Sequence, residues 1–243
     1  MRKFFQTEWQ GITFRSFAKL SMDRIADEAF YAAFYDEFFN RYSSWSSLDP
    51  GWRSLKKDVA HLIASRIQTH DARVLSIGCG LGYVEKVLNE SIPTITLELT
   101  ETSESPLRWL RLENFAKAMH VGHFPQCLPD GRKYDLIYLS AVDYCFDRDE
   151  WPRFLSQVRA HLSPITGRCV IVSASMERYS SWIERVRCLA AVWLARLGLR
   201  EQGQFWGYLR SVDDQRAALI SAGFPNWVDG RLSDGTYWIE GRL

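Results

Sequence analysis

The stretch VLSIGCGLGYVEKVL, residues 74–88, constrains the fold more than any other part of the sequence. It begins as a short apolar run typical of a buried strand, breaks into glycines at alternate positions and continues with a helical pattern. Glycine adopts backbone angles that other residues avoid and lets a ligand approach the backbone closely. The stretch therefore predicts a strand, a tight turn and a helix, with the amides of Gly78, Gly80 and Gly82 turned toward a bound molecule.

The spacing of these glycines narrows the kind of ligand. A dinucleotide fingerprint, G-x-G-x-x-G, would need a glycine at position 83, where the chain has Tyr83. The spacing here is G-x-G-x-G, and the sequence contains no G-x-x-x-x-G-K-[ST] phosphate loop. We therefore expect neither NAD binding nor nucleotide hydrolysis.

Apolar runs at 94–100, 134–140 and 168–175 alternate with helical patterns after the glycine turn. This alternation predicts an α/β fold in which a parallel sheet carries helices on both faces. Near the end, a short helix over 211–223 precedes two strand-like runs joined at SDG. That arrangement predicts a closing hairpin and one antiparallel strand.

The N-terminal part of the chain has a different pattern. Apolar residues recur at helical spacing through residues 20–70, and Pro50 and Gly51 interrupt them. We interpret residues 1–70 as a helical cap that covers the acceptor, and residues 71–243 as the main domain.

Composition and charge exclude several classes of protein. Lys and Arg total 30 against 29 Asp and Glu, so the formal charge of +1 gives no overall field that would attract nucleic acid. The five cysteines are widely spaced and odd in number, which disfavours a disulfide framework or a zinc site and favours a cytoplasmic protein. No run reaches the roughly 20 apolar residues of a membrane span. The segment 188–198, CLAAVWLARLG, is interpreted as the core face of a helix, with a peripheral membrane contact as its alternative.

With these features the chain resembles the class I S-adenosylmethionine-dependent methyltransferases, whose first motif is an apolar strand followed by G-C-G-x-G. The resemblance covers residues 73–175 by motif and the last 70 residues by layout. It implies a Rossmann-like, mostly parallel seven-stranded sheet and S-adenosylmethionine as the cofactor. The cofactor-binding residues that it implies are Gly78, Cys79, Gly80, Gly82, Glu101, Thr102, His123, Phe124, Ser140 and Ala141.

The resemblance also implies an acidic residue that holds the cofactor ribose at the end of the second strand. Glu101 lies 19 positions after Gly82, near the roughly 20 found in related sheets, and Glu98 is the alternative if that strand ends earlier. The chain departs from the common pattern in having Glu rather than Asp at this place. It also has Ser76 where the first strand often carries an acid.

Methyl transfer from a sulfonium is a direct displacement, so the protein mainly aligns the acceptor and excludes water. A hydroxyl acceptor that keeps its proton needs a base, for which Asp143, His123 and, less favoured, Asp147 are candidates. A single histidine after a strand is more often a hydrogen-bonded spacer than a base, and this is the alternative role of His123. The loops contain no convergent set of carboxylates, so no metal is expected.

The acceptor is suggested by aromatic content and by a missing motif. No [ND]-P-P-[YFW] follows the fourth strand, which disfavours methylation of nucleic acid. Aromatic rings are dense in the cap and suit the C–H faces of sugars, and Tyr42, Trp45 and Tyr144 are the expected acceptor contacts. With a resemblance to methyltransferases encoded with bacterial polysaccharide assembly, this favours a saccharide hydroxyl. The alternatives are another small molecule, or a non-catalytic cofactor-binding scaffold.

Overall fold

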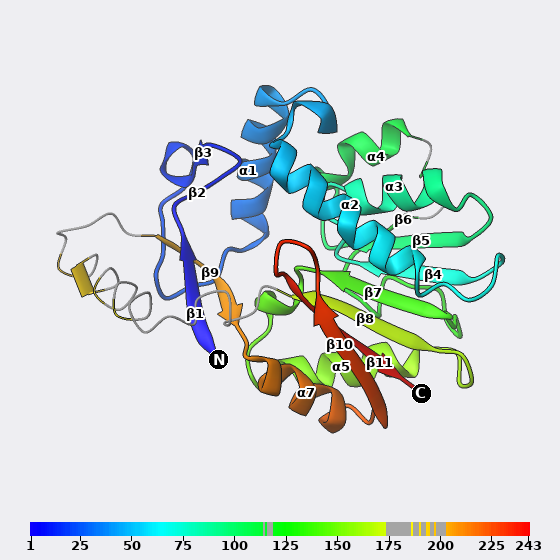
Figure 1. Ribbon diagram of the computed structural model, residues 1–243. Helices are drawn as coiled ribbons and strands as arrows, with labels where there is room; N and C mark the ends of the chain where they lie inside the picture. Colours follow the sequence, from blue (N-terminus) through cyan, green and yellow to red (C-terminus); the bar gives the residue numbers. More distant parts are fainter. Residues whose placement is uncertain are drawn as a thin grey trace.

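The computed structural model describes residues 1–113, 115, 119–173, 186, 190, 193–194, 197 and 203–243. Its main feature is a seven-stranded sheet with the order β10-β11-β8-β7-β4-β5-β6 (Figure 1). The strands from β8 to β6 run parallel, whereas β11 is antiparallel to both of its neighbours. The predicted parallel sheet and closing hairpin are therefore confirmed. The strands are β4 (Arg73–Ile77), β5 (Thr96–Glu101), β6 (Met119–Val121), β7 (Leu136–Ser140), β8 (Arg168–Ser173), β10 (Asn226–Arg231) and β11 (Tyr237–Arg242).

Helices cover both faces of this sheet. Alternate strand residues point to opposite faces, and each face carries apolar side chains that pack against helices. Val74 and Tyr138 face one apolar core, which receives α2, α3 and α4, whereas Leu75 and Ile137 face a second core beneath α5 and α7. The helices are α1 (Glu28–Arg41), α2 (Pro50–Ala64), α3 (Tyr83–Ser91), α4 (Arg108–Leu112), α5 (Glu150–Ala160) and α7 (Val212–Ser221).

Several helix starts follow directly from local sequence. Asp27 and Asp49 accept hydrogen bonds from the backbone amides of Phe30 and Trp52, and so cap α1 and α2. The predicted start of the last helix is also confirmed, since Ser211 caps α7 in a reciprocal capping box.

The N-terminal part is helical only in part. Strand β1 (Arg2–Gln6) pairs antiparallel with β9 (Gln204–Leu209), and β2 (Glu8–Trp9) pairs with β3 (Ile12–Thr13). The β1–β9 pair joins the first residues of the chain to the segment just before α7 (Figure 1). The cap is therefore tied to the main domain by backbone hydrogen bonds, and the boundary at residue 70 stays a prediction.

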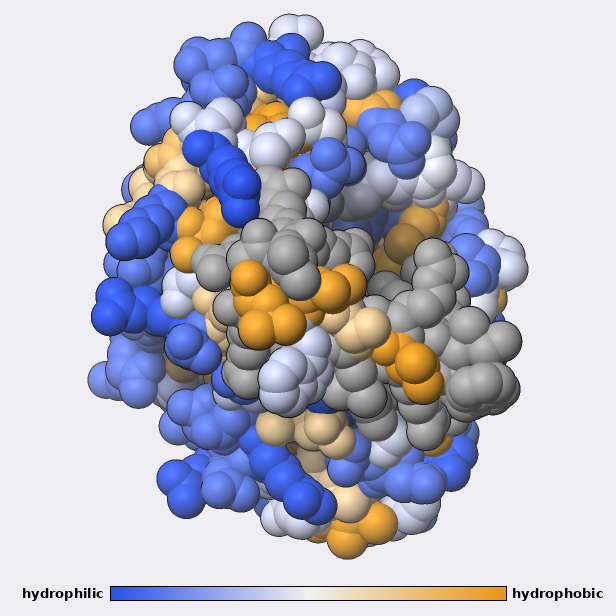
Figure 2. Space-filling model, turned by 90° about the vertical axis from the view of Figure 1, so that its left-hand side faces the viewer, coloured by the Kyte–Doolittle hydropathy of each residue, from blue (hydrophilic) through white to orange (hydrophobic). Residues whose placement is uncertain are grey.

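The surface seen in Figure 2 carries hydrophilic residues over most of its area and an apolar group near its centre. Within the segment 188–198, the described side chains of Trp193, Leu194 and Leu197 are exposed. The predicted core face is absent at these three positions, and most of that segment lies outside the described residues. No described helix has the length and apolar character needed to cross a bilayer.

Aromatic rings form the core between the cap and the main domain. Phe38 of α1 is fully buried and packs against Trp9, Phe34 and Trp109, with ring centroids 5.5–5.9 Å apart. Phe39, which the sequence places on the buried face, is only partly buried. Phe38, and not Phe39, is thus the buried ring near the end of α1.

We predict that Phe38→Ala lowers the free energy of unfolding by about 3–5 kcal/mol, because it removes a buried ring and leaves a cavity. Phe39→Ala, at the partly buried neighbour, is the matched control and should cost clearly less. Urea denaturation followed by circular dichroism measures both. Equal losses in the two variants would contradict the orientation of α1.

Candidate functional site

The glycine turn joins β4 to α3, and all three glycines have positive φ, at 67°, 56° and 70°. A Cβ at Gly78 would lie 2.7 Å from a methyl of Val142, and one at Gly82 would overlap Leu110. At Gly80 the nearest neighbour would be the Tyr35 hydroxyl, 4.0 Å away. Gly78 and Gly82 are therefore required for close packing, and Gly80 is the glycine that leaves space for a ligand.

The amides of the turn are used differently from the prediction. Those of Gly78 and Cys79 donate to the Thr100 carbonyl, at 2.9 and 3.2 Å, and that of Gly82 donates to the Cys79 carbonyl. The Gly80 amide donates to Glu101 Oε2 at 2.8 Å. Three of these amides hold the turn against β5, and the fourth closes the turn on itself, so none of the four is directed at a ligand.

Glu101 is the acid at the site. It lines the cavity described below, and its Oε1 accepts hydrogen bonds from the amide and hydroxyl of Thr102. Burial raises the pKa of its carboxyl group, and the bonds from Gly80 and Thr102 counteract that rise. The alternative, Glu98, is buried elsewhere among His120, Tyr134 and Arg132.

A cavity of about 470 Å³ opens beside this turn, at the carboxyl ends of β4, β5 and β7. Five of the predicted cofactor residues line it, namely Gly78, Glu101, Thr102, His123 and Phe124. The sequence interpretation missed other lining residues, which include Val142, Cys145, Phe146, Arg153 and Gln157. Ser140 and Ala141 lie at the end of β7 next to Val142, and Ala141 has a positive φ of 60°. A non-glycine residue in this conformation is strained, as is common at functional sites.

Helix α1 supplies two tyrosines that the sequence interpretation also missed. Tyr35 faces Gly80, and the phenol of Tyr31 lies beside that of Tyr144. Burial raises the pKa of all three phenols far above the usual value, with nearby charges adding to the rise. These side chains are therefore neutral hydrogen-bond donors at neutral pH, and no general base is provided by them.

The predicted base Asp143 does not face the cavity. Its side chain is 1% exposed, and Oδ2 accepts hydrogen bonds from Ser173 of β8 and from Gln215 of α7, the latter at 2.7 Å. Asp147 caps the start of α5 by accepting from the amides of Asp149 and Glu150. Both carboxylates are occupied in holding loops, so their geometry does not support direct proton transfer from an acceptor.

His123 lies at the rim of the cavity, and its side chain is 73% exposed. Its Nε2 is 3.4 Å from Glu28 Oε1, at the first residue of α1. His123 is thus the one predicted base that lines the cavity, and it joins the adjoining loop to the start of α1. In the described part of the chain, no cluster of three or more His, Cys, Asp or Glu side chains is arranged to hold a metal.

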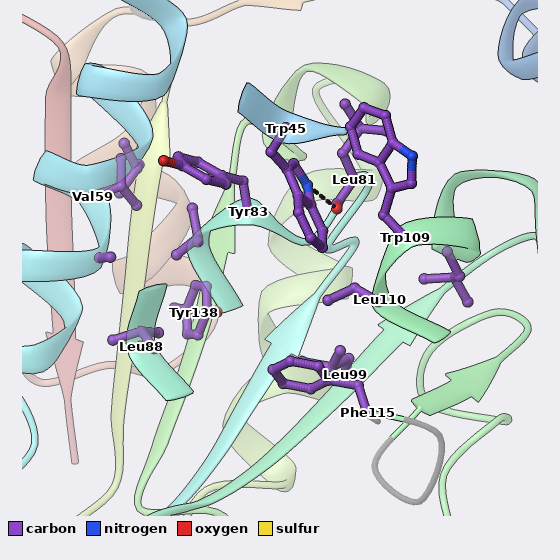
Figure 3. Packing of buried hydrophobic residues seen from close by; sticks show 14 of the residues in the cluster. Trp45, Val59, Leu81, Tyr83, Leu88, Leu99, Trp109, Leu110, Phe115 and Tyr138 are labelled. Atoms are coloured by element: carbon purple, nitrogen blue, oxygen red, sulfur yellow. Dashed lines mark hydrogen bonds between the residues drawn. The ribbon is translucent and has the colours of Figure 1, made fainter. Parts of the chain in front are cut away.

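The predicted acceptor contacts Tyr42 and Trp45 lie away from the cavity. Trp45 is 6% exposed, and its indole Nε1 donates to the Leu81 carbonyl of the glycine turn at 2.9 Å (Figure 3). Tyr42 donates to the Gln10 carbonyl at 2.7 Å. Trp45 thus packs the cap onto the main domain, and Tyr42 bonds within the cap, which corrects their expected role. Tyr144, by contrast, is beside Tyr31.

We predict a pH effect from the burial of Asp143, which raises the pKa of its carboxyl group to about 6. A raised pKa in the folded state means that the protonated form favours folding, and that this contribution is lost as pH rises from about 4 to 6. Compared with Asp143→Asn, the wild type should lose about 3 kcal/mol of stability over that interval. Urea denaturation of both proteins at several pH values measures this difference. A constant difference would contradict it.

The sequence profile of the family described as "Methyltransferase domain" matches residues 51–223. A putative O-methyltransferase from Nostoc punctiforme is similar in structure, with a TM-score of 0.53 and 20% identity over 79% of this chain and 60% of that one. PigF, solved with SAH, is similar with a TM-score of 0.60 and 17% identity over 91% of this chain and 63% of that one. The mitomycin 7-O-methyltransferase MmcR has a TM-score of 0.59 and 19% identity over 86% of this chain and 57% of that one.

The chain thus spans about 60% of the length of these solved structures. No curated protein matches it in sequence. The structural likenesses, all at low identity, bear on the fold, and the family profile extends over most of the chain. The chain belongs to the methyltransferase domain family.

Proposed function

We propose that the chain transfers the methyl group of S-adenosylmethionine to a hydroxyl group of a small-molecule acceptor. The observation that carries this proposal is the cavity beside the glycine turn, where Glu101 both lines the cavity and accepts a hydrogen bond from the Gly80 amide. Similar solved structures include proteins named as O-methyltransferases, which supports a hydroxyl as the acceptor group.

The residues around the cavity fit S-adenosylmethionine. A carboxylate has about four acceptor positions, and Glu101 uses three of them, so one is left for a ribose hydroxyl. Val142 and Phe124 offer apolar surface on which an adenine ring can pack. The space at Gly80, under Tyr35, suits the methionine part of the molecule. Gly78, Cys79 and Gly82 act indirectly by holding the turn.

The bound cofactor supplies a methyl group that is already activated on a sulfonium. The chain then has to exclude water and orient the acceptor. Tyr35 is buried, Tyr31 and Tyr144 are partly buried, and all three are protonated, so they can cover the reaction space and donate hydrogen bonds to polar groups of the acceptor. His123, oriented by Glu28, is the proposed acceptor of the hydroxyl proton.

A saccharide hydroxyl is the narrower proposal. Tyr42 and Trp45 no longer support it, but another set of rings does. The ring centroids of Tyr31 and Trp206 are 5.4 Å apart, and those of Tyr144 and Trp206, which are stacked, are 6.5 Å apart. Aromatic faces with polar edges suit the C–H faces of sugars. The same rings can also stack on a planar aromatic acceptor, so the acceptor class has to be tested directly.

We predict that Glu101→Gln weakens the binding of S-adenosylmethionine by about 1.5–3 kcal/mol, because a charged acceptor of ribose hydrogen bonds is lost. Glu98→Gln is the control, since Glu98 lies in a separate buried cluster and should affect stability more than affinity. Isothermal titration calorimetry measures both. Stronger damage from Glu98→Gln would contradict the assignment of the ribose site.

We predict that the protein forms S-adenosylhomocysteine when incubated with labelled S-adenosylmethionine and saccharides that carry free hydroxyls. A matched set of phenols and other planar hydroxyl compounds is tested in parallel. Turnover with the planar set alone would exclude the saccharide and retain the O-methyltransferase. Binding of the cofactor without turnover on any acceptor would favour a non-catalytic scaffold.

A further inference from the structure

A buried polar cluster lies directly behind the glycine turn, on the face of the sheet that α2 and α3 cover. Glu85, in the first turn of α3, is 2% exposed. Its Oε1 accepts hydrogen bonds from Ser76 of β4 at 2.6 Å and from Tyr138 of β7 at 2.7 Å. Its Oε2 is buried and has no hydrogen-bond partner among the described residues. A carboxylate in this position brings negative charge into the core.

Lys56 of α2 brings the opposite charge to the same region. Its Nζ donates to Ser140 Oγ at 2.9 Å, at the carboxyl end of β7. Burial lowers the pKa of Lys56 and raises that of Glu85, and in each case the charge of the other residue counteracts the shift. Each residue therefore offsets the charge of the other, although the hydrogen bonds of both go to hydroxyl groups of other residues.

Both charges are close to the turn. Ser76, which Glu85 contacts, is two residues before Gly78, a span of about 7 Å along a strand. The charge of Glu85 also contributes, after burial, to raising the pKa of the Cys79 thiol within the turn. Ser140, which Lys56 contacts, precedes Ala141 and Val142 at the edge of the cavity. The cluster thus lies one layer behind the proposed cofactor position and does not line the cavity.

Methyl transfer changes the charge that this site has to hold. The bond between the methyl carbon and sulfur breaks, its electron pair stays on sulfur, and the acceptor oxygen bonds to the methyl group and loses its proton. The positively charged sulfonium becomes a neutral thioether. A fixed negative charge nearby favours the sulfonium form, and a fixed positive charge disfavours it.

We propose that buried Glu85 and partly buried Lys56 each act, with opposite sign, on the preference of the site for S-adenosylmethionine over S-adenosylhomocysteine. Neither residue touches the cofactor, so both act through space on its net charge. The inference rests on the proposed function. One unit charge about 10 Å away, at an effective dielectric constant of roughly 20 to 40, changes the ratio of the two affinities about four- to fifteenfold. The pair thereby tunes how readily the product leaves.

The test is the ratio of the two dissociation constants, measured by calorimetry for each variant. Glu85→Gln should lower the preference for S-adenosylmethionine about four- to fifteenfold, and Lys56→Met should raise it by a similar factor. Because both ligands bind the same protein, a general loosening of the turn cancels in the ratio. Glu90→Gln, an exposed acid on the same helix, is the matched control and should leave the ratio unchanged.

A purely structural role for the cluster predicts a different result. Equal changes of both affinities, or shifts of the ratio in the same direction in both variants, would overturn the inference. If Glu85→Gln does not fold, the sign of the shift in Lys56→Met decides alone, and no shift there counts against the proposal. Wild-type protein that binds neither ligand would instead overturn the proposed function.

Discussion

The site depends on the absence of side chains at Gly78 and Gly82. A Cβ at either position would collide with Val142 or Leu110, so β4, α4 and the loop after β7 can meet only because these two residues are glycines. The turn is then held by hydrogen bonds to Thr100 and to the Glu101 carboxylate. The same contacts that shape the turn also place the acid of β5 beside it.

The N-terminal cap packs against the same glycine turn. Trp45 donates to the carbonyl of Leu81, inside the turn, and packs against Tyr83 and Trp109, so the cap is fixed to the same few residues (Figure 3). Helix α1 then passes over the site and presents Tyr31 and Tyr35 at helical spacing. The proposed spaces for cofactor and acceptor thus both adjoin this turn and this helix, and a change in cap packing is expected to affect both.

The alternation of strands and helices along the chain, the glycine turn and the position of Glu101 at the end of a strand could be predicted because each has a local signal in the sequence. The pairing of β1 with β9 could not be predicted, because the two strands are far apart in the sequence and neither carries a local signal for its partner. Helical spacing showed that α1 has a buried face but not what that face covers, so Tyr31 and Tyr35 were missed. Trp45 follows a helix in a polar segment, and only the folded chain shows it buried. Asp143 has the right residue type, but its orientation depends on Ser173 and Gln215.

Ser76 illustrates how a departure in sequence can be compensated in space. The first strand lacks the acid that the resemblance leads one to expect, yet the hydroxyl of Ser76 donates to a carboxylate that comes from α3. The charge has therefore moved from the strand to the helix behind the turn, and Tyr138 and Lys56 stabilise it there. A buried carboxylate needs such partners, because burial alone would favour its neutral form. Comparing motifs position by position would count the acid as lost, whereas the folded chain places a carboxyl group of α3 against the same strand residue.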